Sequence, residues 1–278
     1  MQLTREILPL PRAIAPDEEI IAIGDIHGRG DLLEALLDEA AKEPRQAAQR
    51  RVVFTGDLID RGPDSLGALA LARDAAVLIG AKETIGLMGN HEILMRLTLD
   101  PATPARVALA ALDVWLGNGG DAVVEELIGP EAPGGGAHRL LRRLREATPA
   151  PVAAWLSGLA SHYRSGRVLF VHAGVNPTLP IEGFLELPWD TPLDRFEEAA
   201  HWAWVRTPFL AHRPDAQGFQ GYFVVHGHSP LDLGHTRGPA EQVRRFRLNL
   251  DGGSAMTGRA KMAILRGGLA EIVTARAN

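Results

Sequence analysis

The sequence predicts an α/β fold in which two mixed β-sheets pack face to face and helices cover both outer faces, a four-layer α-β-β-α sandwich. Three apolar runs in the first third of the chain each end in polar residues, and a helix-like pattern follows each of them. These runs are residues 20–24, 51–56 and 84–89. Strand, polar end and helix repeated in this way are typical of β-α-β units. Three late runs indicate an antiparallel meander instead, with Gly267 and Gly268 in a hairpin turn. They are residues 246–250, 262–265 and 269–273.

The helices of the first units follow from the spacing of apolar residues. We expect a helix over 31–43, because apolar residues recur there at helical spacing, Asp31 stands where an N-cap would, and Pro44 follows. The apolar residues are Leu32, Leu33, Leu36, Leu37 and Ala40. A second helix is expected over 66–76, and another after 90–92.

The region from Pro101 to about His162 is richer in Ala, Leu and Arg than its surroundings. It predicts a few helices inserted as a cap, at about 101–162, into a single domain that comprises residues 1–278. Three glycine-containing breaks interrupt this insert, and they are either connectors between helices or hinges of a lid over the substrate. The breaks are residues 117–120, 129–130 and 133–136.

Strands are expected again at 167–171 and 222–225. Between them the sequence indicates a Pro-rich loop and a Trp-rich helix that contains 201–206. We expect Trp202 and Trp204 of this helix to pack in the core.

The composition excludes several classes of site. The 278-residue chain carries a net charge of −5 and has no Cys. The charge offers no basic surface for a nucleic acid polymer, and without Cys there is no disulfide, thiolate metal site or Cys nucleophile. Residues 1–16 lack the layout of a signal peptide, and no segment has the uninterrupted apolar length of a membrane span. We therefore expect a soluble cytoplasmic protein with no membrane partner.

Five of the expected strand ends carry groups that bind metals. They are Asp25 with His27, Asp57, Asn90 with His91, His172, and His228. Residues i and i+2 of a strand lie on the same side, so Asp25 and His27 are expected to face one point. His226 lies on the same strand face as His228, so spacing alone admits either of them as a ligand.

Carboxylates and imidazoles buried together at one sheet edge would be very costly without cations. Oxygen and nitrogen donors without sulfur suit Mn²⁺, Fe or Zn²⁺. The set is larger than one catalytic metal needs, and it fits two metals bridged by one Asp. Such pairs typically lie about 3.5–4 Å apart and serve in-line displacement at phosphorus.

These motifs resemble, in the same order, the motif series of the phosphoprotein phosphatase (PPP) family of calcineurin-like metallophosphoesterases, in its bacterial serine/threonine phosphatase type. The matching stretches are Gly-Asp-Ile-His-Gly at 24–28, Gly-Asp-Leu-Ile-Asp-Arg-Gly at 56–62, Gly-Asn-His-Glu at 89–92, His-Ala-Gly at 172–174 and His-Gly-His-Ser-Pro at 226–230. The resemblance spans about residues 20–275, and the insert at 101–162 matches poorly. As a set, the motifs are highly specific.

The resemblance implies a role for each residue of the site. Asp25 and His27 would hold the first metal, Asp57 would bridge both metals, and the second metal would be held by Asn90, His172 and His228. The family pattern thus favours His228 over His226, which would lie behind the ligands. The two divalent ions are expected to be Mn²⁺, with Fe or Zn²⁺ as alternatives.

The remaining motif residues would act on the substrate. By the same resemblance, His91 would protonate the leaving oxygen as a general acid, and Asp60 would keep it protonated and oriented. Arg61 and Arg206 would bind the phosphate, since a guanidinium matches two phosphate oxygens. Asp251 has no catalytic role in this assignment.

The implied reaction is hydrolysis of a phosphomonoester by a hydroxide held between two metals, with a phosphoserine or phosphothreonine protein, or a small phosphate ester, as substrate. The alternative is the symmetrical cleavage of diadenosine tetraphosphate. Bis(5'-nucleosyl)-tetraphosphatases share the run Arg-Gly-Pro-x-Ser-Leu seen at 61–66, but tend to carry Ala at the place of Asp60. This chain has both Asp60 and His91, which favours a substrate with a poorer, alkoxide leaving group, such as phosphoserine or phosphothreonine. A remote alternative is an inactive binding module, which would be expected to have lost ligands.

Overall fold

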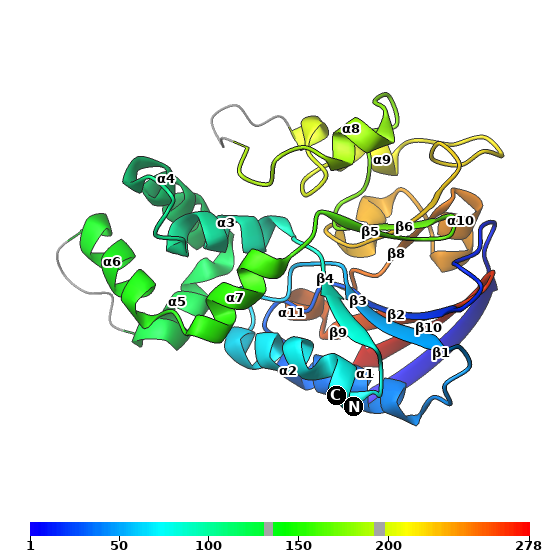
Figure 1. Cartoon of the computed structure of the whole chain (residues 1–278), viewed down its shortest axis with the longest axis horizontal. Helices are drawn as coiled ribbons and strands as arrows, with labels where there is room; N and C mark the ends of the chain where they lie inside the picture. Colours follow the sequence, from blue (N-terminus) through cyan, green and yellow to red (C-terminus); the bar gives the residue numbers. More distant parts are fainter. Residues whose placement is uncertain (131–135, 192–197) are drawn as a thin grey trace.

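The computed structural model describes residues 1–130, 136–191 and 198–278, and within them two β-sheets are stacked between helical layers (Figure 1). In these ranges the first sheet has six strands, in the order β1 (Gln2–Pro9), β10 (Leu269–Arg276), β9 (Arg259–Arg266), β2 (Glu18–Ile23), β3 (Gln49–Phe54) and β4 (Glu83–Gly86). The second sheet has four in the same ranges, in the order β5 (His162–Ser165), β6 (Val168–Val171), β7 (Phe223–His226) and β8 (Arg247–Asn249). This arrangement confirms the predicted fold class.

Strand β2 is buried on both faces. Neighbouring side chains of a strand point in opposite directions, so they enter the layers on either side of the sheet. Ile20 faces the second sheet and belongs to the core that contains Phe170. Ile21 faces the other way, towards the core beneath α1 (Gly30–Lys42) and α2 (Ser65–Leu78). The far face of the second sheet is covered by α8 (Ile181–Leu185), α9 (Thr207–Leu210) and the turn between 201 and 206. Short helices complete the chain: η3 (Glu198–Ala200), η4 (Pro230–Gly234), α10 (Pro239–Arg244) and α11 (Ser254–Thr257).

Strand pairing confirms most of the sequence prediction. β2, β3 and β4 run parallel, as β-α-β units require. β9 and β10 form an antiparallel hairpin across Gly267, whose φ of 54° suits glycine. The prediction for 246–250 was wrong, since β8 pairs in parallel with β7 in the second sheet and does not join the meander. Leu248 of β8 is fully buried in the core between the sheets, so tertiary packing selects its partner.

Three local predictions differ from the structure. β1 and β5 have no counterpart in the sequence prediction, and β1 is an exposed edge strand held by its ladder to β10. The segment 201–206 is a turn and not a helix, although Trp202 and Trp204 pack in the core as expected. Asp31 does not cap α1, because Arg29 occupies the N-cap and pairs with Asp31 in the first turn.

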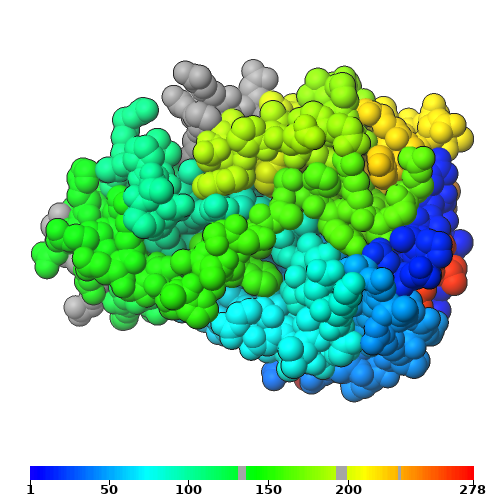
Figure 2. All heavy atoms as spheres, viewed as in Figure 1, coloured from blue at the N-terminus to red at the C-terminus, as the bar shows by residue number. Residues whose placement is uncertain are grey.

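The insert folds as helices around a π-helical turn. Within the described residues it contains α4 (Ala105–Trp115), the π-turn η1 (Leu116–Gly120), α5 (Asp121–Ile128), α6 (Ala137–Ala147) and α7 (Ala150–Gly158). With α3 (Asn90–Leu99) these helices form the lobe at the left of Figure 1 and the green end of the molecule in Figure 2. Of the three expected breaks, 117–120 is the π-turn and 129–130 follows α5, while 133–135 lies outside the described residues.

One stretch of the insert is long and apolar enough, by length and composition alone, to cross a membrane, which differs from the sequence expectation. It is the 24-residue run Ala105–Ile128, with mean hydropathy 1.3. Gly119, with φ of 98°, kinks this run. The buried side chains of Ala111 and Trp115 pack in two of the protein's own cores. Its apolar residues therefore serve contacts with neighbouring helices.

Candidate metal centre

The polar residues that follow β2, β3, β4, β6 and β7 come together in one buried cluster. Donor atoms of Asp57, His172 and His228 all lie within 4.8 Å of one another, and so do those of His27, Asp57 and His91. Asn90 Oδ1 lies 3.2 Å from His172 Nε2, and Asp25 Oδ2 accepts the backbone N–H of His228 at 2.8 Å. The structure therefore brings together all six residues expected to hold metals: Asp25, His27, Asp57, Asn90, His172 and His228.

Asp25 and His27 are placed by a loop and not by strand alternation. β2 ends at Ile23, and the backbone N–H groups of Ile26 and His27 both donate to the Asp57 carbonyl at 3.0 Å. Of the eight non-glycine residues with positive φ in the described parts of the chain, five lie in these loops. They are His27, Asp57, Asp60, Arg61 and His228. Backbone strain of this kind gathers at functional sites, where the surrounding structure maintains it.

Two histidines direct Nε2 towards Asp57. His27 Nδ1 lies 2.9 Å from the Ile59 carbonyl, and His172 Nδ1 lies 2.9 Å from the Thr55 carbonyl. A carbonyl only accepts, so each Nδ1 carries a proton, and each Nε2 faces the cluster, where its deprotonated form can bind a cation. These Nε2 atoms lie 3.7 Å and 3.3 Å from Asp57 Oδ2. Both imidazoles thus direct Nε2 towards one carboxylate, and, although burial opposes its protonation, Asp57 raises the pKa of His172 above its usual value.

His91, Asp60 and Arg61 form a hydrogen-bonded chain beside the cluster. His91 Nδ1 lies 2.5 Å from Asp60 Oδ2, and both residues are buried. The exposed Arg61 places Nη2 2.9 Å from His91 Nε2 and Nη1 2.7 Å from His27 Nε2. A guanidinium only donates, so His91 Nε2 accepts and the ring proton is on Nδ1, facing Asp60. A cavity of about 530 Å³ opens beside Arg61.

Two residues of this region were missed by sequence reasoning. The Glu92 carboxylate accepts the backbone N–H groups of Asp57 and Leu58, each at 2.8 Å, and of Gly89 at 3.0 Å. Its position three residues after Gly89, at the start of α3, was a detectable capping signal. Trp115, from the insert, donates its Nε1–H to Asp60, 2.9 Å from both carboxylate oxygens. No local pattern marks a Trp in an apolar helix as a partner of Asp60.

The charges of the cluster are unbalanced without cations. Burial raises the pKa of Asp25 well above its usual value, and the nearby carboxylates of Asp251 and Asp57 raise it further. Burial also opposes ionisation of Asp57, but His172, His91 and His27 together hold its pKa well below the ordinary range. Several acidic groups thus share a buried space in which their anionic forms need positive charge.

The donor set fits divalent metals. In the described residues Asp25 Oδ1 and His228 Nε2 are buried and have no hydrogen-bond partner. The space around the carboxylates also requires glycine, since a Cβ on Gly227 would lie 1.8 Å from Asp25 Oδ1 and one on Gly89 would lie 2.1 Å from Asp57 Oδ1. Carboxylate, imidazole and amide donors without sulfur match Mn²⁺, Fe or Zn²⁺.

The other predicted residues surround this cluster. Arg206 is half-buried and close to the site: burial lowers the pKa of His228, and the charges of His172 and Arg206 lower it further. His226 is fully buried, and its ring packs edge-on against Phe209 with centroids 4.9 Å apart. It belongs to neither set of mutually close donors in the described residues, whereas His228 does.

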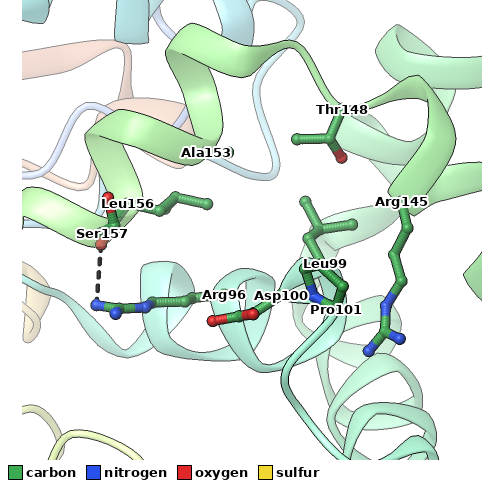
Figure 3. A pocket seen from close by; sticks show the side chains of 9 residues that line it. All are labelled: Arg96, Leu99, Asp100, Pro101, Arg145, Thr148, Ala153, Leu156 and Ser157. Carbon is green, nitrogen blue, oxygen red and sulfur yellow. Dashed lines mark hydrogen bonds between the residues drawn. The ribbon is translucent and has the colours of Figure 1, made fainter.

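A separate cavity lies inside the helical lobe. It has a volume of about 360 Å³ and lies between α3, α6 and α7 (Figure 3). Arg96 donates to the Leu156 carbonyl at 3.1 Å and stacks 4.0 Å over the Trp189 ring. Arg145 donates to the Thr98 and Thr103 carbonyls. Both guanidinium groups therefore bind the protein itself, and the cavity lacks the convergent carboxylates and imidazoles of the metal centre.

Comparisons with known proteins agree with this geometry. The model of the family described as Calcineurin-like phosphoesterase matches residues 19–256. Serine/threonine-protein phosphatase 1 of Salmonella typhimurium is 40% identical over 99 residues, which cover 36% of this chain and 38% of that protein. A symmetrical bis(5'-nucleosyl)-tetraphosphatase of Ralstonia nicotianae is 31% identical over 193 residues, 69% of this chain and 54% of that protein. The chain thus spans about half or less of the length of these curated relatives.

Among solved structures, a protein serine/threonine phosphatase from Saccharomyces cerevisiae superposes with a TM-score of 0.55 at 15% identity, covering 95% of this chain and 81% of that one. At this identity the likeness supports the fold alone. The family match contains every candidate ligand from Asp25 to His228 and the second sheet, while β1, β9 and β10 of the first sheet lie outside it. The chain therefore belongs to the calcineurin-like phosphoesterases.

Proposed function

We propose that this chain is a metal-dependent phosphomonoester hydrolase that dephosphorylates phosphoserine and phosphothreonine in proteins. The observation that carries this proposal is the buried 2.5 Å hydrogen bond between His91 and Asp60. A serine or threonine alkoxide is a poor leaving group, so its departure benefits from a positioned proton donor. The Salmonella serine/threonine phosphatase relative supports the same reading.

Two divalent metals would occupy the cluster. Asp25 and His27 would hold the first, Asp57 would bridge, and the second would be held by Asn90, His172 and His228. The absence of Cys and the mixed oxygen and nitrogen donors support Mn²⁺, with Fe or Zn²⁺ as alternatives. When bound, such ions supply positive charge at the phosphate and lower the pKa of a water ligand.

The side chains around the metals would bind phosphate and move one proton. Arg61, exposed and aimed at two imidazole nitrogens, would exchange these partners for phosphate oxygens, since an anionic phosphate offers the guanidinium two parallel hydrogen bonds and an opposite charge. That exchange would leave His91 Nε2 free to take up a proton from water and pass it to the leaving oxygen, while its Nδ1 stays bonded to Asp60. Arg206 would approach the phosphate from the side of α9.

The alternative substrate is diadenosine tetraphosphate. The Ralstonia relative and the Arg-Gly-Pro-x-Ser-Leu run at 61–66 support it. A nucleotide leaving group needs less help from a general acid, which makes the retained Asp60 harder to explain. An inactive binding module is opposed by the complete donor set, because loss of ligands would be expected.

One experiment separates these functions. Purified protein loaded in turn with Mn²⁺, Fe²⁺ and Zn²⁺ is assayed on a phosphoserine peptide, a phosphotyrosine peptide and diadenosine tetraphosphate. We expect kcat/KM for the phosphoserine peptide to exceed that for the dinucleotide by about tenfold or more. A preference for the dinucleotide would reject the protein phosphatase. Activity on p-nitrophenyl phosphate that disappears on metal removal would reject the inactive module.

A further inference from the structure

The π-turn of the insert contacts the motif that would carry the chemistry. Trp115, at the end of α4, reaches Asp60, and the turn that follows reaches Arg61. We propose that Trp115 and Gly119 are positioning residues, Trp115 for the Asp60–His91 pair and Gly119 for Arg61. This inference rests on the proposed phosphatase function and assigns to the insert a part in catalysis.

Trp115 restrains the Asp60 carboxylate. Its indole N–H, which can only donate, lies 2.9 Å from both carboxylate oxygens, and its side chain is fully buried. A donor shared by both oxygens opposes rotation of the carboxylate, whose Oδ2 is also the partner of His91. The backbone N–H of Asp60 is held separately by Ser65 Oγ at 3.0 Å. Without the indole N–H, the bond to His91 would be the one side-chain hydrogen bond left to the carboxylate among the described residues.

Gly119 restrains Arg61. The Arg61 backbone N–H donates to the Gly119 carbonyl at 2.9 Å, and Arg61 Nε donates to the Asn118 carbonyl at 3.3 Å. Gly119 has φ of 98°, and a Cβ there would lie 2.6 Å from Arg61 Cγ. Contact this close requires glycine, because any side chain would push the arginine stem away. The break at 117–120, expected as a connector or hinge, is thus a fixed contact with the phosphate-binding motif.

A further contact fixes the insert to the same motif. The Glu126 carboxylate of α5 accepts the backbone N–H groups of Ser65 and Leu66 at 2.7 Å and 2.8 Å. These groups open α2, directly after the 56–62 motif. The insert therefore holds residues 60–66 at three points, one before the π-turn, one within it and one after it.

The Trp115 arm of the test uses a matched pair of variants. Trp115→Phe removes the indole N–H and keeps a ring, while Trp155→Phe removes an indole N–H that has no hydrogen-bond partner in the described residues. With metal-loaded protein, we expect Trp115→Phe to lower kcat on a phosphoserine peptide about tenfold to a hundredfold, with KM and metal content unchanged. On p-nitrophenyl phosphate the loss should stay below about threefold, because its leaving group needs little protonation. Equal losses on both substrates, or the same effect in Trp155→Phe, would overturn the role of Trp115.

The Gly119 arm has its own matched control. Gly119→Ala should raise KM for every phosphate ester, and the inhibition constant of inorganic phosphate, by about tenfold, since a misplaced guanidinium loses bidentate contact. Gly117→Ala is the control, because a Cβ at Gly117 would meet no atom within 4 Å. Phosphate affinity that is equal in the two variants would overturn the role of Gly119.

A spectroscopic measurement that does not depend on turnover tests the contact between Trp115 and Asp60 even if a variant folds poorly or the wild-type protein is inactive. In ¹⁵N-tryptophan-labelled protein, Asp60→Asn should shift the Trp115 indole N–H resonance and speed its solvent exchange by about tenfold, leaving that of Trp155 unchanged. An unmoved Trp115 resonance would overturn the proposal whatever the activity. Wild-type protein inactive on all phosphate esters would reject the proposed function instead.

Discussion

Replacing Asp60 by Asn separates the catalytic role of the carboxylate from its place in the fold. In the structure this carboxylate accepts from His91 Nδ1 and from Trp115 Nε1. An amide has one accepting oxygen and one donating NH₂, so one of these two N–H groups must face another donor. A buried donor without an acceptor costs about 1–3 kcal/mol. We expect the free energy of unfolding of the Asp60→Asn variant to fall by about that amount.

The kinetic effect should be larger and should depend on the substrate. General acid catalysis contributes about 10²–10⁴-fold, which corresponds to about 2.7–5.4 kcal/mol at 1.36 kcal/mol per factor of ten. An amide does not stabilise a positive charge on His91 as a carboxylate does. We therefore expect kcat on a phosphoserine peptide to fall by about a hundredfold or more, and kcat on p-nitrophenyl phosphate by less than about tenfold.

Stopped assays on both substrates, metal analysis and thermal melts of the same preparations test this reasoning. Asp64→Asn is the control, because Asp64 lies in the same loop, caps α2 through Gly67 at 3.1 Å, and Asn caps helices about as well as Asp. Equal losses on the two phosphate esters in Asp60→Asn, with two metals still bound, would refute the assignment of a proton-donating His91–Asp60 pair.

Three further changes test the metal centre. Asp57→Asn removes the carboxylate shared by both donor sets, so we expect fewer than two metals per chain by mass spectrometry and no hydrolysis of p-nitrophenyl phosphate; full metal content would contradict a bridging role. His91→Ala should retain both metals and slow alkyl phosphates more than aryl ones, and a uniform loss would count against His91 as the acid. Gly227→Ala introduces a Cβ 1.8 Å from Asp25 Oδ1, which would displace this carboxylate, so a lower chelator concentration than for the wild type should strip the metal. Gly158→Ala, whose Cβ would meet no atom within 4 Å, should behave as the wild type.

Parts of the fold that depend on local pattern could be predicted from the sequence. The later parts of β2 and β3, residues 20–23 and 52–54, are buried on both faces, so they appear as continuous apolar runs, and the helices after them keep their 3.6-residue spacing. β1 could not be predicted, since it is an exposed edge strand that owes its conformation to its ladder with β10. The direction of β8 depends on the second sheet, which forms only when distant segments meet.

The composition of the site was predictable to a greater extent than its geometry. Motif order identified the residues that converge, but the expected alternation of Asp25 and His27 along a strand was wrong. β2 ends before Asp25, and His27 takes φ of 47° because its N–H and that of Ile26 are bound by the Asp57 carbonyl. Such cross-loop bonds have no periodic signal, and the same is true of Trp115, which lies 55 residues from Asp60.

The contacts of the insert bear on how substrate preference arises in this chain. Arg61 and Asp60 are adjacent, and Arg61 is held by Gly119 of the π-turn while Asp60 is held by Trp115, the last residue of α4 before that turn. A change in α4 or α5 that shifts this turn would therefore move the phosphate ligand and the partner of His91 together. Affinity for phosphate and help to the leaving group are thus coupled through one structural element, although they are separate steps of the reaction. It follows that exchanging the insert for that of a relative should alter both the substrate bound and the leaving group that can be expelled.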